Sequence, residues 1–203
     1  MVENKLPKSG YSKGSADNFV LNAGAVVRDL KWDSAEGWTY EKFGASSGGS
    51  TLTLNNTLRQ MEIDGVFATP VGGDVIETSE GTIELNLLEF TRKNIQSALI
   101  ADFEASDGTE YPEGYDVIKP SRQVEADHYI KNLAYIGTLS GSDLPIIVIF
   151  DYAICTSGLE FSPQDNNDNT FSMTFSARTD AENVEDTSLP VRILVPQGGL
   201  GGA

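Results

Sequence analysis

The sequence predicts a mostly-β domain of antiparallel strands with one packed α-helix. Three observations predict it. Apolar and polar residues alternate with a period of two in several segments, other short runs are apolar throughout, and one segment has amphipathic helical spacing. The order is strands, one helix, then strands, unlike the regular strand–helix alternation of a parallel sheet. A length of 203 residues suits one large domain or two small ones, and we expect a single domain over 1–196.

Before the helix, three segments indicate strands. The run 18–27 is apolar on both faces, and 58–67 predicts a strand that ends in a tight turn at Asp64-Gly65. The segment 81–90 alternates strictly, which is typical of a strand with one face on the core. Its apolar face contains Ile83, Leu85 and Leu87.

The helix is predicted over 91–100. Thr91 can cap its N-terminus with the side-chain hydroxyl. Ile95, Ala98 and Leu99 follow the i, i+3, i+4 spacing that makes one apolar stripe. A helix of about ten residues is marginal alone, so we expect it to pack against the sheet.

After the helix, strands are predicted at 128–139, 145–154, 170–178 and 191–195. The run 145–154 is apolar on both faces, which indicates either a central strand covered on both sides or a strand that meets another subunit. The segments 105–120, 163–169 and 180–190 are polar and predict loops. The Gly-rich end, 197–203, predicts a flexible tail.

The charge balance excludes several classes of partner. Fourteen Lys and Arg oppose 30 Asp and Glu, for a net charge of −16. Tight binding to nucleic acid relies on basic side chains that release counterions, so this composition argues against it, and against docking to an anionic membrane. No run of about 18 apolar residues predicts a transmembrane helix. The single cysteine, Cys155, lies in an apolar run and fits a reducing compartment.

No constellation of residues predicts catalysis, a cofactor site or a metal site. One His and one Cys cannot form a zinc cluster, and His128 beside Asp127 is only a fragment of a site. Asp165, Asn167 and Asn169 resemble the start of a calcium loop, but the loop's glycine and closing glutamate are missing. We therefore expect a protein that is not an enzyme.

The stretch GASSGGS, 44–50, resembles a phosphate-binding loop only superficially. Ser50 stands where a Walker loop requires lysine, and a strand-like pattern follows where a helix is needed to hold phosphate. The remaining interpretation is a hinge at the base of a flexible Thr/Leu/Asn arm.

Three blocks in order resemble the major tail (tail tube) proteins of long-tailed bacteriophages with non-contractile tails, the siphophages. They are GASSGGSTLTL (44–54), LRQMEIDGVFATPVGGDVI (58–76) and GTIELNLLEFTRKNIQSAL (81–99). The resemblance covers roughly 23–100, and the later strands carry no motif of the family.

The resemblance implies a β-sandwich or barrel-like pair of sheets with a flanking helix. It implies hexameric rings that stack around a tape-measure protein into a hollow conduit with an acidic lumen, through which DNA is ejected. The subunit is then part of the virion tail, assembled in the host cytoplasm, with tail tip and tail terminator proteins as further partners. An N-terminal arm (1–16) and a long loop (41–57) are implied to reach adjacent rings. The implied assembly-loop residues are Gly44, Ser47, Gly48, Gly49, Thr51, Leu52 and Leu54, and the candidate acidic lumen residues are Glu62, Asp64, Asp74 and Glu84.

Two alternatives stay open. One is a tube protein of a contractile tail or a secretion system, which the family's relatives include. The other is a carbohydrate-binding or adhesin-like β-sandwich, for which exposed aromatic residues would be the support. The candidates are Trp32, Trp38, Tyr40, Tyr111 and Tyr115.

Overall fold

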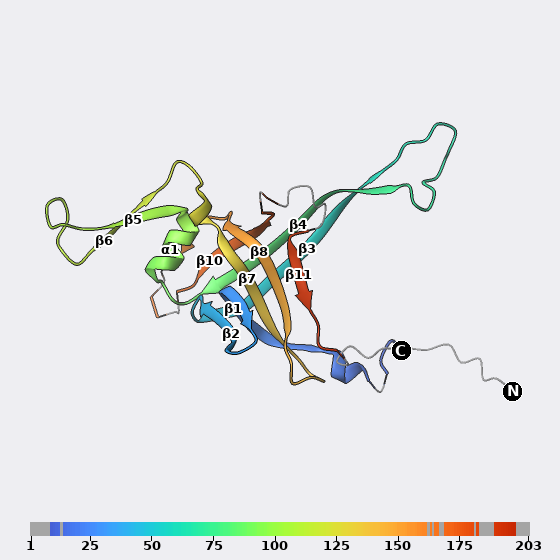
Figure 1. The fold of residues 1–203 in the computed structure, drawn as a ribbon, viewed down its shortest axis with the longest axis horizontal. Coiled ribbons are helices and arrows are strands. Elements are labelled where there is room, and N and C mark those ends of the chain that lie inside the picture. The colour runs from blue at the N-terminus through green and yellow to red at the C-terminus, as the bar shows by residue number, and fades with distance from the viewer. Residues whose placement is uncertain are drawn as a thin grey trace.

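The computed structural model describes residues 9–12, 14–161, 163, 165–166, 169–180, 182 and 189–197. Across these residues it shows an antiparallel sheet of nine strands, a separate two-stranded sheet and one α-helix (Figure 1). The nine strands are β1 Val20–Asp33, β2 Gly37–Lys42, β3 Ser46–Gln60, β4 Asp74–Leu87, β7 Ile130–Leu139, β8 Ile146–Cys155, β9 Glu160–Phe161, β10 Phe171–Arg178 and β11 Val191–Leu194. The small sheet pairs β5 (Ala101–Ala105) with β6 (Asp116–Pro120), and the helix is α1 (Arg92–Leu99). The mostly-β fold class with one helix is thus confirmed.

The main sheet divides at β8. Its strand order is β2-β1-β7-β8-β10-β4-β3, with β11 and β9 off this path. One edge of β8 pairs with β7, whereas the other edge pairs with β11 over 147–150 and with β10 over 152–155. β10 and β11 therefore diverge from one strand, and the sheet wraps around an interior.

The interior explains why 145–154 is apolar on both faces. Val148 and Phe150 of β8 belong to the main core cluster, whereas the alternate residues Ile147 and Ile149 belong to a second, smaller cluster on the opposite face. β8 is therefore a central strand covered on both sides within one chain. The main cluster comprises Phe43, Ile83, Leu85, Leu87, Ala98, Ile130, Leu133, Val148, Phe150, Ala153, Cys155, Phe171, Met173 and Phe175.

The helix forms where the sequence predicts it. The Thr91 hydroxyl accepts a hydrogen bond from the Asn94 backbone N–H at 3.3 Å, which caps the N-terminus. The helix ends at Ile100, which takes a left-handed conformation (φ 51°). Asn94 and Ala98 are buried on the face that meets the sheet.

The predicted long loop at 41–57 is wrong. Residues 46–60 form β3, which pairs with β4 from Ser46 opposite Leu87 to Gln60 opposite Asp74. Gly48 and Gly49 have positive φ and lie where the pairing register shifts between Ser46 and Ser50, so they form an irregularity within a strand and not a hinge. Thr51, Thr53 and Thr57 then continue the strand at alternate positions, because β-branched residues favour strands.

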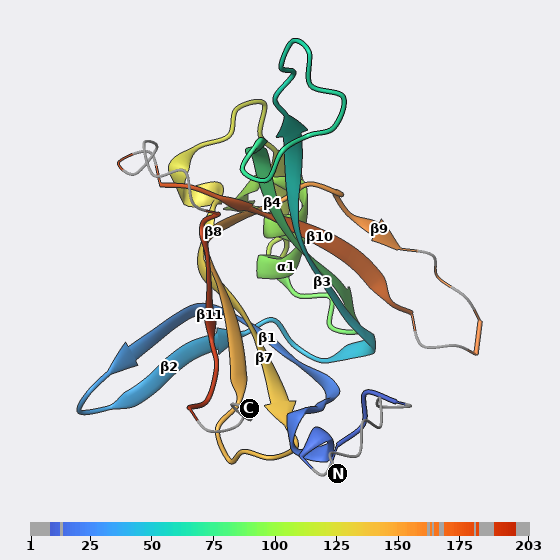
Figure 2. The same ribbon diagram turned by 90° about the vertical axis from the view of Figure 1, so that its right-hand side faces the viewer.

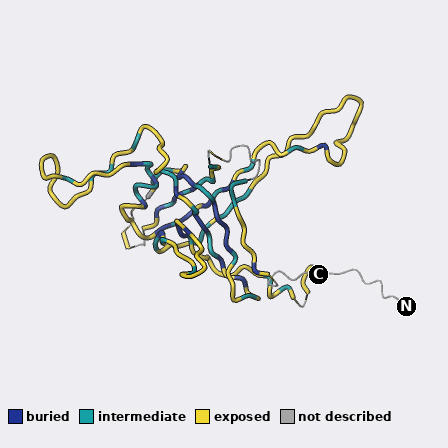
Figure 3. The backbone as a smooth tube through the Cα atoms, in the orientation of Figure 1, coloured by how far each residue is buried: buried dark blue, intermediate teal, exposed yellow. Residues whose placement is uncertain are grey.

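The predicted strand 58–67 ends at Gln60, and residues 61–73 form the irregular tip of the β3–β4 hairpin. The expected turn at Asp64-Gly65 is present, with Gly65 at φ 80°. This hairpin extends well beyond the body in both views (Figures 1 and 2), and the β5–β6 hairpin projects on the other side (Figure 1). Both projections are largely exposed, whereas the buried residues gather in the central strands (Figure 3).

The predicted loops and tails differ in how far the structure describes them. The polar segment 105–120 is a loop only up to Tyr115, because β6 begins at Asp116. Much of the N-terminal arm (1–16), of the segment 163–169 and of the C-terminal tail (197–203) lies outside the described residues. Asn167, one member of the calcium-loop pattern, is among those.

Candidate assembly surfaces

A broad polar face covers β10, β4 and β3. Cross-strand rows place Thr174 beside Glu84 and Thr51, and Ser176 beside Thr82 and Thr53. These side chains point away from the core, because the alternate residues Met173, Leu85 and Leu52 point into it. The face consists of Thr51, Thr53, Asn55, Thr57, Thr78, Glu80, Thr82, Glu84, Asn86, Ser172, Thr174 and Ser176.

Charge on this polar face is entirely acidic. Glu80 and Glu84 are exposed, and none of its twelve residues is Lys or Arg. Arg178 continues the alternation of Ser172, Thr174 and Ser176 on β10, so one exposed base lies at the end of this face, where Arg178 pairs with Tyr152 of β8. The Lys131 ammonium lies 5.6 Å from the Tyr152 ring centroid. The result is a hydroxyl-rich surface with two negative charges.

The structure does not bring the four predicted lumen acids together. Glu84 lies on the polar face, but Asp74 begins β4 at the distal end of the hairpin. Ten residues of strand separate them, which is about 33 Å at the usual strand rise. Glu62 and Asp64 lie in the tip loop beyond Asp74. Sequence reasoning missed Glu80, although it has the same parity as Glu84 in an alternating strand.

The tip of the β3–β4 hairpin is an ordered loop with apolar side chains in solvent. Its backbone is held by hydrogen bonds from the Met61 N–H to the Gly73 carbonyl (2.8 Å) and from the Gly73 N–H to the Pro70 carbonyl (2.9 Å). Phe67 and Val71 are fully exposed, at 105% and 108% of their reference areas. The other exposed apolar side chains of this tip cluster are Met61, Ile63 and Val66.

An apolar groove of about 680 Å³ opens between β1, β2 and the turn that joins β7 to β8. Its buried residues from the second core cluster are Val27, Leu30 and Ile147. Trp38, Tyr40 and Leu144 are exposed along it. Of the described residues that line it, Lys42 alone is charged.

The predicted assembly-loop residues separate into different environments. Leu52 and Leu54 pack against the main core of their own chain, so they are not free surface residues. Thr51 lies on the polar face, and Ser47 is exposed at the irregular start of β3. Gly44 has φ 118°, a backbone conformation that L side chains rarely adopt, so its role is set by the local backbone.

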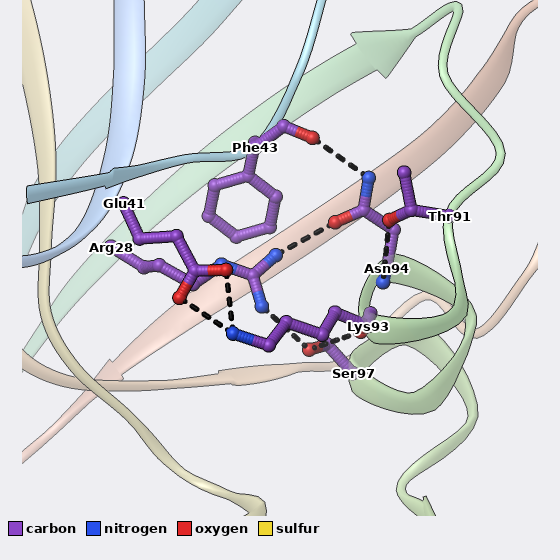
Figure 4. Close-up of polar contacts among 7 residues, drawn as sticks. All are labelled: Arg28, Glu41, Phe43, Thr91, Lys93, Asn94 and Ser97. Atoms are coloured by element: carbon purple, nitrogen blue, oxygen red, sulfur yellow. Dashed lines mark hydrogen bonds and ion pairs between the residues drawn. The ribbon is translucent and has the colours of Figure 1, made fainter.

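A buried polar network joins the helix to the sheet (Figure 4). Arg28 of β1 donates to the Asn94 side-chain carbonyl at 2.7 Å, and its guanidinium lies 3.9 Å from the Phe43 ring centroid. The Asn94 amide donates to the Phe43 backbone carbonyl at 2.8 Å. Burial lowers the pKa of Arg28, and the nearby Glu41 and Asp29 carboxylates oppose that shift.

An ion pair closes this network at the surface. The Lys93 ammonium lies 2.6 and 2.8 Å from the two Glu41 carboxylate oxygens. This hydrogen bond lowers the pKa of Glu41 below its usual value. The network fixes the helix, β1 and the β2–β3 connection as one unit.

The His128 side chain stabilises the turn that contains it. Its side chain is buried, its Nδ1 accepts a hydrogen bond from the Glu125 N–H at 2.9 Å, and its Nε2 lies 3.7 Å from the Asp102 carboxylate. Among the described residues, no group of three or more His, Cys, Asp or Glu side chains is placed to hold a metal ion. No helix within the described ranges is long and apolar enough to cross a membrane.

The exposed aromatic residues of the binding-module alternative lie on two separate hairpins. Trp32 and Trp38 pack on each other across the β1–β2 pair, with ring centroids 5.1 Å apart. Tyr111 and Tyr115 are exposed in the β5–β6 hairpin. The aromatic residues therefore do not form a single platform.

No protein-family model and no curated protein matches the chain. Among solved structures, it is similar to the tail of an empty gene transfer agent particle refined with C6 symmetry, with a TM-score of 0.40 and 11% identity over 78% of this chain and 92% of that chain. It is similar to a chain of the native gene transfer agent virion (TM-score 0.38, 9% identity, 76% and 92% covered). It is also similar to the SPP1 tail tube (TM-score 0.41, 11% identity, 83% and 85% covered).

Proposed function

We propose that the chain is a structural, non-catalytic subunit of a phage tail tube. In this role six copies form a ring, and rings stack around a tape-measure protein into a hollow conduit for DNA. Two observations support the role: the three sequence blocks between 44 and 99 that resemble tail tube proteins, and surfaces suited to repeated contact between copies. The polar face carries the proposal, because it suits the lining of a DNA conduit.

A DNA conduit must not hold DNA. Affinity for duplex DNA comes mainly from Lys and Arg that neutralise phosphates and release counterions. None of the twelve residues of the polar face is Lys or Arg, Arg178 lies only at its end, and Glu80 and Glu84 repel phosphate. Its hydroxyl and amide side chains keep a layer of water on the wall. We therefore propose this face as the lumen wall, with Glu80 and Glu84 as its acids.

The edges of the main sheet suit ring closure. β2 and β3 end the strand path, so each has one edge without a partner among the described strands. β3 is 15 residues long and carries no charged side chain from Ser46 to Leu58. A long, uncharged edge strand readily pairs with another chain. Edge pairing between unlike surfaces of successive copies closes a ring when the rotation between copies is right.

The test is direct imaging of the purified chain. Negative-stain micrographs across a concentration series are expected to show rings and tubes with a central hole, and light scattering is expected to rise in parallel. A strict monomer at the highest concentration, or solid aggregates without a hole, would sink the proposal.

The carbohydrate-binding alternative predicts a different result. A monomer that binds glycans, with affinity lost when Trp38 is changed to alanine, would favour it. Tubes without glycan binding favour the tail tube subunit.

A further inference from the structure

The tip cluster of the β3–β4 hairpin needs a partner. Met61, Ile63, Val66, Phe67 and Val71 are exposed on a loop whose backbone is already fixed by its own hydrogen bonds. A further bond from the Thr69 hydroxyl to the Gln60 side-chain carbonyl (3.0 Å) holds the base of the loop. Five exposed apolar side chains on one projecting loop indicate a contact surface, because exposing them to water is unfavourable.

The apolar groove beside the β7–β8 turn is a suitable receptor for this cluster. It offers the apolar side chains of Tyr40, Trp38 and Leu144 along an opening of about 680 Å³. Aromatic side chains supply large contact area to an apolar ligand with little loss of conformational entropy.

The charges of the two surfaces are complementary. The tip contains Glu62 and Asp64, and no Lys or Arg occurs between Arg59 and Arg92. The groove contains Lys42, which forms no ion pair with a described residue. In a chain of net charge −16, a basic residue at an apolar groove is a specific feature that selects an acidic ligand.

The position of the two surfaces identifies the occupant as a second copy. The hairpin tip lies at the top and the β7–β8 turn at the bottom in both views, with the central strands between them (Figures 1 and 2). The hairpin strands pair from Ser46 to Gln60, so the tip cannot fold back to its own groove. Each copy carries one tip and one groove at opposite ends, which is a heterologous arrangement that generates an open stack.

We infer that the tip cluster of one copy inserts into the groove between β1, β2 and the β7–β8 turn of the next copy, with Glu62 and Asp64 near Lys42. This inference rests on the proposed function and names the axial contact between stacked subunits. The contact joins an ordered loop to a preformed groove, so it adds little ordering cost on association.

Charge reversal tests the pairing. Lys42→Glu alone and Glu62→Lys/Asp64→Lys alone are each expected to raise the concentration for half-maximal assembly by about tenfold or more, because like charges then meet in an apolar contact. The triple variant restores opposite charges and is expected to recover most of the loss. Arg59→Glu, on the same hairpin outside the tip loop, serves as the matched charge-reversal control.

Cross-linking tests proximity without depending on affinity. Copies with Val66→Cys are mixed with copies with Leu144→Cys and oxidised during assembly, and a covalent dimer of the two is expected. The unmodified chain, whose only cysteine is the buried Cys155, measures the background level of cross-linking. Thr78→Cys, on the polar face of the same hairpin, replaces Val66→Cys in the control and is expected not to cross-link with Leu144→Cys.

The outcomes separate the two proposals. Tubes that form normally with Lys42→Glu, together with absent Val66–Leu144 cross-links, would overturn the axial contact and leave the tail tube role standing. Failure of the unmodified chain to assemble at any concentration would overturn the tail tube role itself. Circular dichroism of each variant at low concentration verifies that the subunit is folded, so that loss of assembly reports on the contact.

Discussion

Replacement of Asn94 by alanine tests whether the buried polar network stabilises the subunit. Asn94 is 1% exposed, and its side chain bonds to the Arg28 guanidinium at 2.7 Å and to the Phe43 carbonyl at 2.8 Å. The substitution leaves a buried charge and a buried carbonyl short of one partner each. A lost bond to a charged group costs about 1.5–3 kcal/mol, and an unsatisfied buried neutral group costs about 1–3 kcal/mol.

The two losses sum to about 2.5–6 kcal/mol of unfolding free energy, less about 0.5 kcal/mol because alanine favours the helix more than asparagine does. Denaturant unfolding, followed by circular dichroism at a concentration below assembly, measures this difference. Lys93→Ala is the matched control on the same helix. It removes an exposed ion pair to Glu41 and is expected to cost about 0–1 kcal/mol.

If Asn94→Ala and Lys93→Ala lowered the unfolding free energy by the same small amount, the reasoning would be refuted, because the buried hydrogen bonds of Asn94 would then contribute no more than an exposed ion pair. A double variant, Arg28→Met with Asn94→Leu, sharpens the test. It removes the buried charge together with its partner, so the unfolding free energy is expected to recover by about half relative to Asn94→Ala. A double variant as unstable as Asn94→Ala would show that packing alone decides the cost.

Three further predictions follow from the same structure. Gly81→Ala places a Cβ atom 3.2 Å from the side chains of three neighbouring strands, so denaturant unfolding is expected to show a loss of about 1–3 kcal/mol. Glu80→Lys with Glu84→Lys is expected to give tubes that retain duplex DNA at low salt and release it at high salt, where the unmodified tube retains none in a sedimentation assay. The depressed pKa of Glu41 means that its bond to Lys93 stabilises the chain above the unfolded pKa of about 4.3 and stops doing so as pH falls through the folded pKa. The unmodified chain is therefore expected to be more stable than Lys93→Ala at pH 6, and this difference in unfolding free energy is expected to shrink towards pH 3. A difference that grows towards pH 3 would contradict this prediction.

The parts of the fold that were predicted correctly depend on local patterns. The helix is specified by Thr91 and the spacing that follows it, and β10 by strict alternation over 171–178. The Gly-rich start of β3 was mispredicted because its strand character comes from pairing with β4, more than thirty residues away. Positive φ at Gly48 and Gly49 is compatible with either a hinge or a bulge, and only the partner strand decides between them.

The positions of the candidate lumen acids were likewise predictable only where they depend on a local pattern. Alternation in 81–90 places Glu84 on the polar side of its strand, and that part was predictable from the sequence. The separation of Asp74 from Glu84 depends on β4 continuing outward into the projecting hairpin. The closeness of these acids in the sequence suggested one acidic patch. In an extended strand, however, two residues ten positions apart are separated by about 33 Å.

The distribution of charge explains how such an acidic chain can assemble with itself. Copies of net charge −16 repel one another, so contacts must occur where acids are few. The uncharged edge of β3 from Ser46 to Leu58 and the groove with Lys42 as its charged residue both satisfy this requirement. Acids concentrate instead on exposed positions such as Glu80 and Glu84 of the polar face. The same negative charge that keeps DNA from sticking to the wall thus also restricts self-association to surfaces that lack acids or that, like the groove with Lys42, offer them a base.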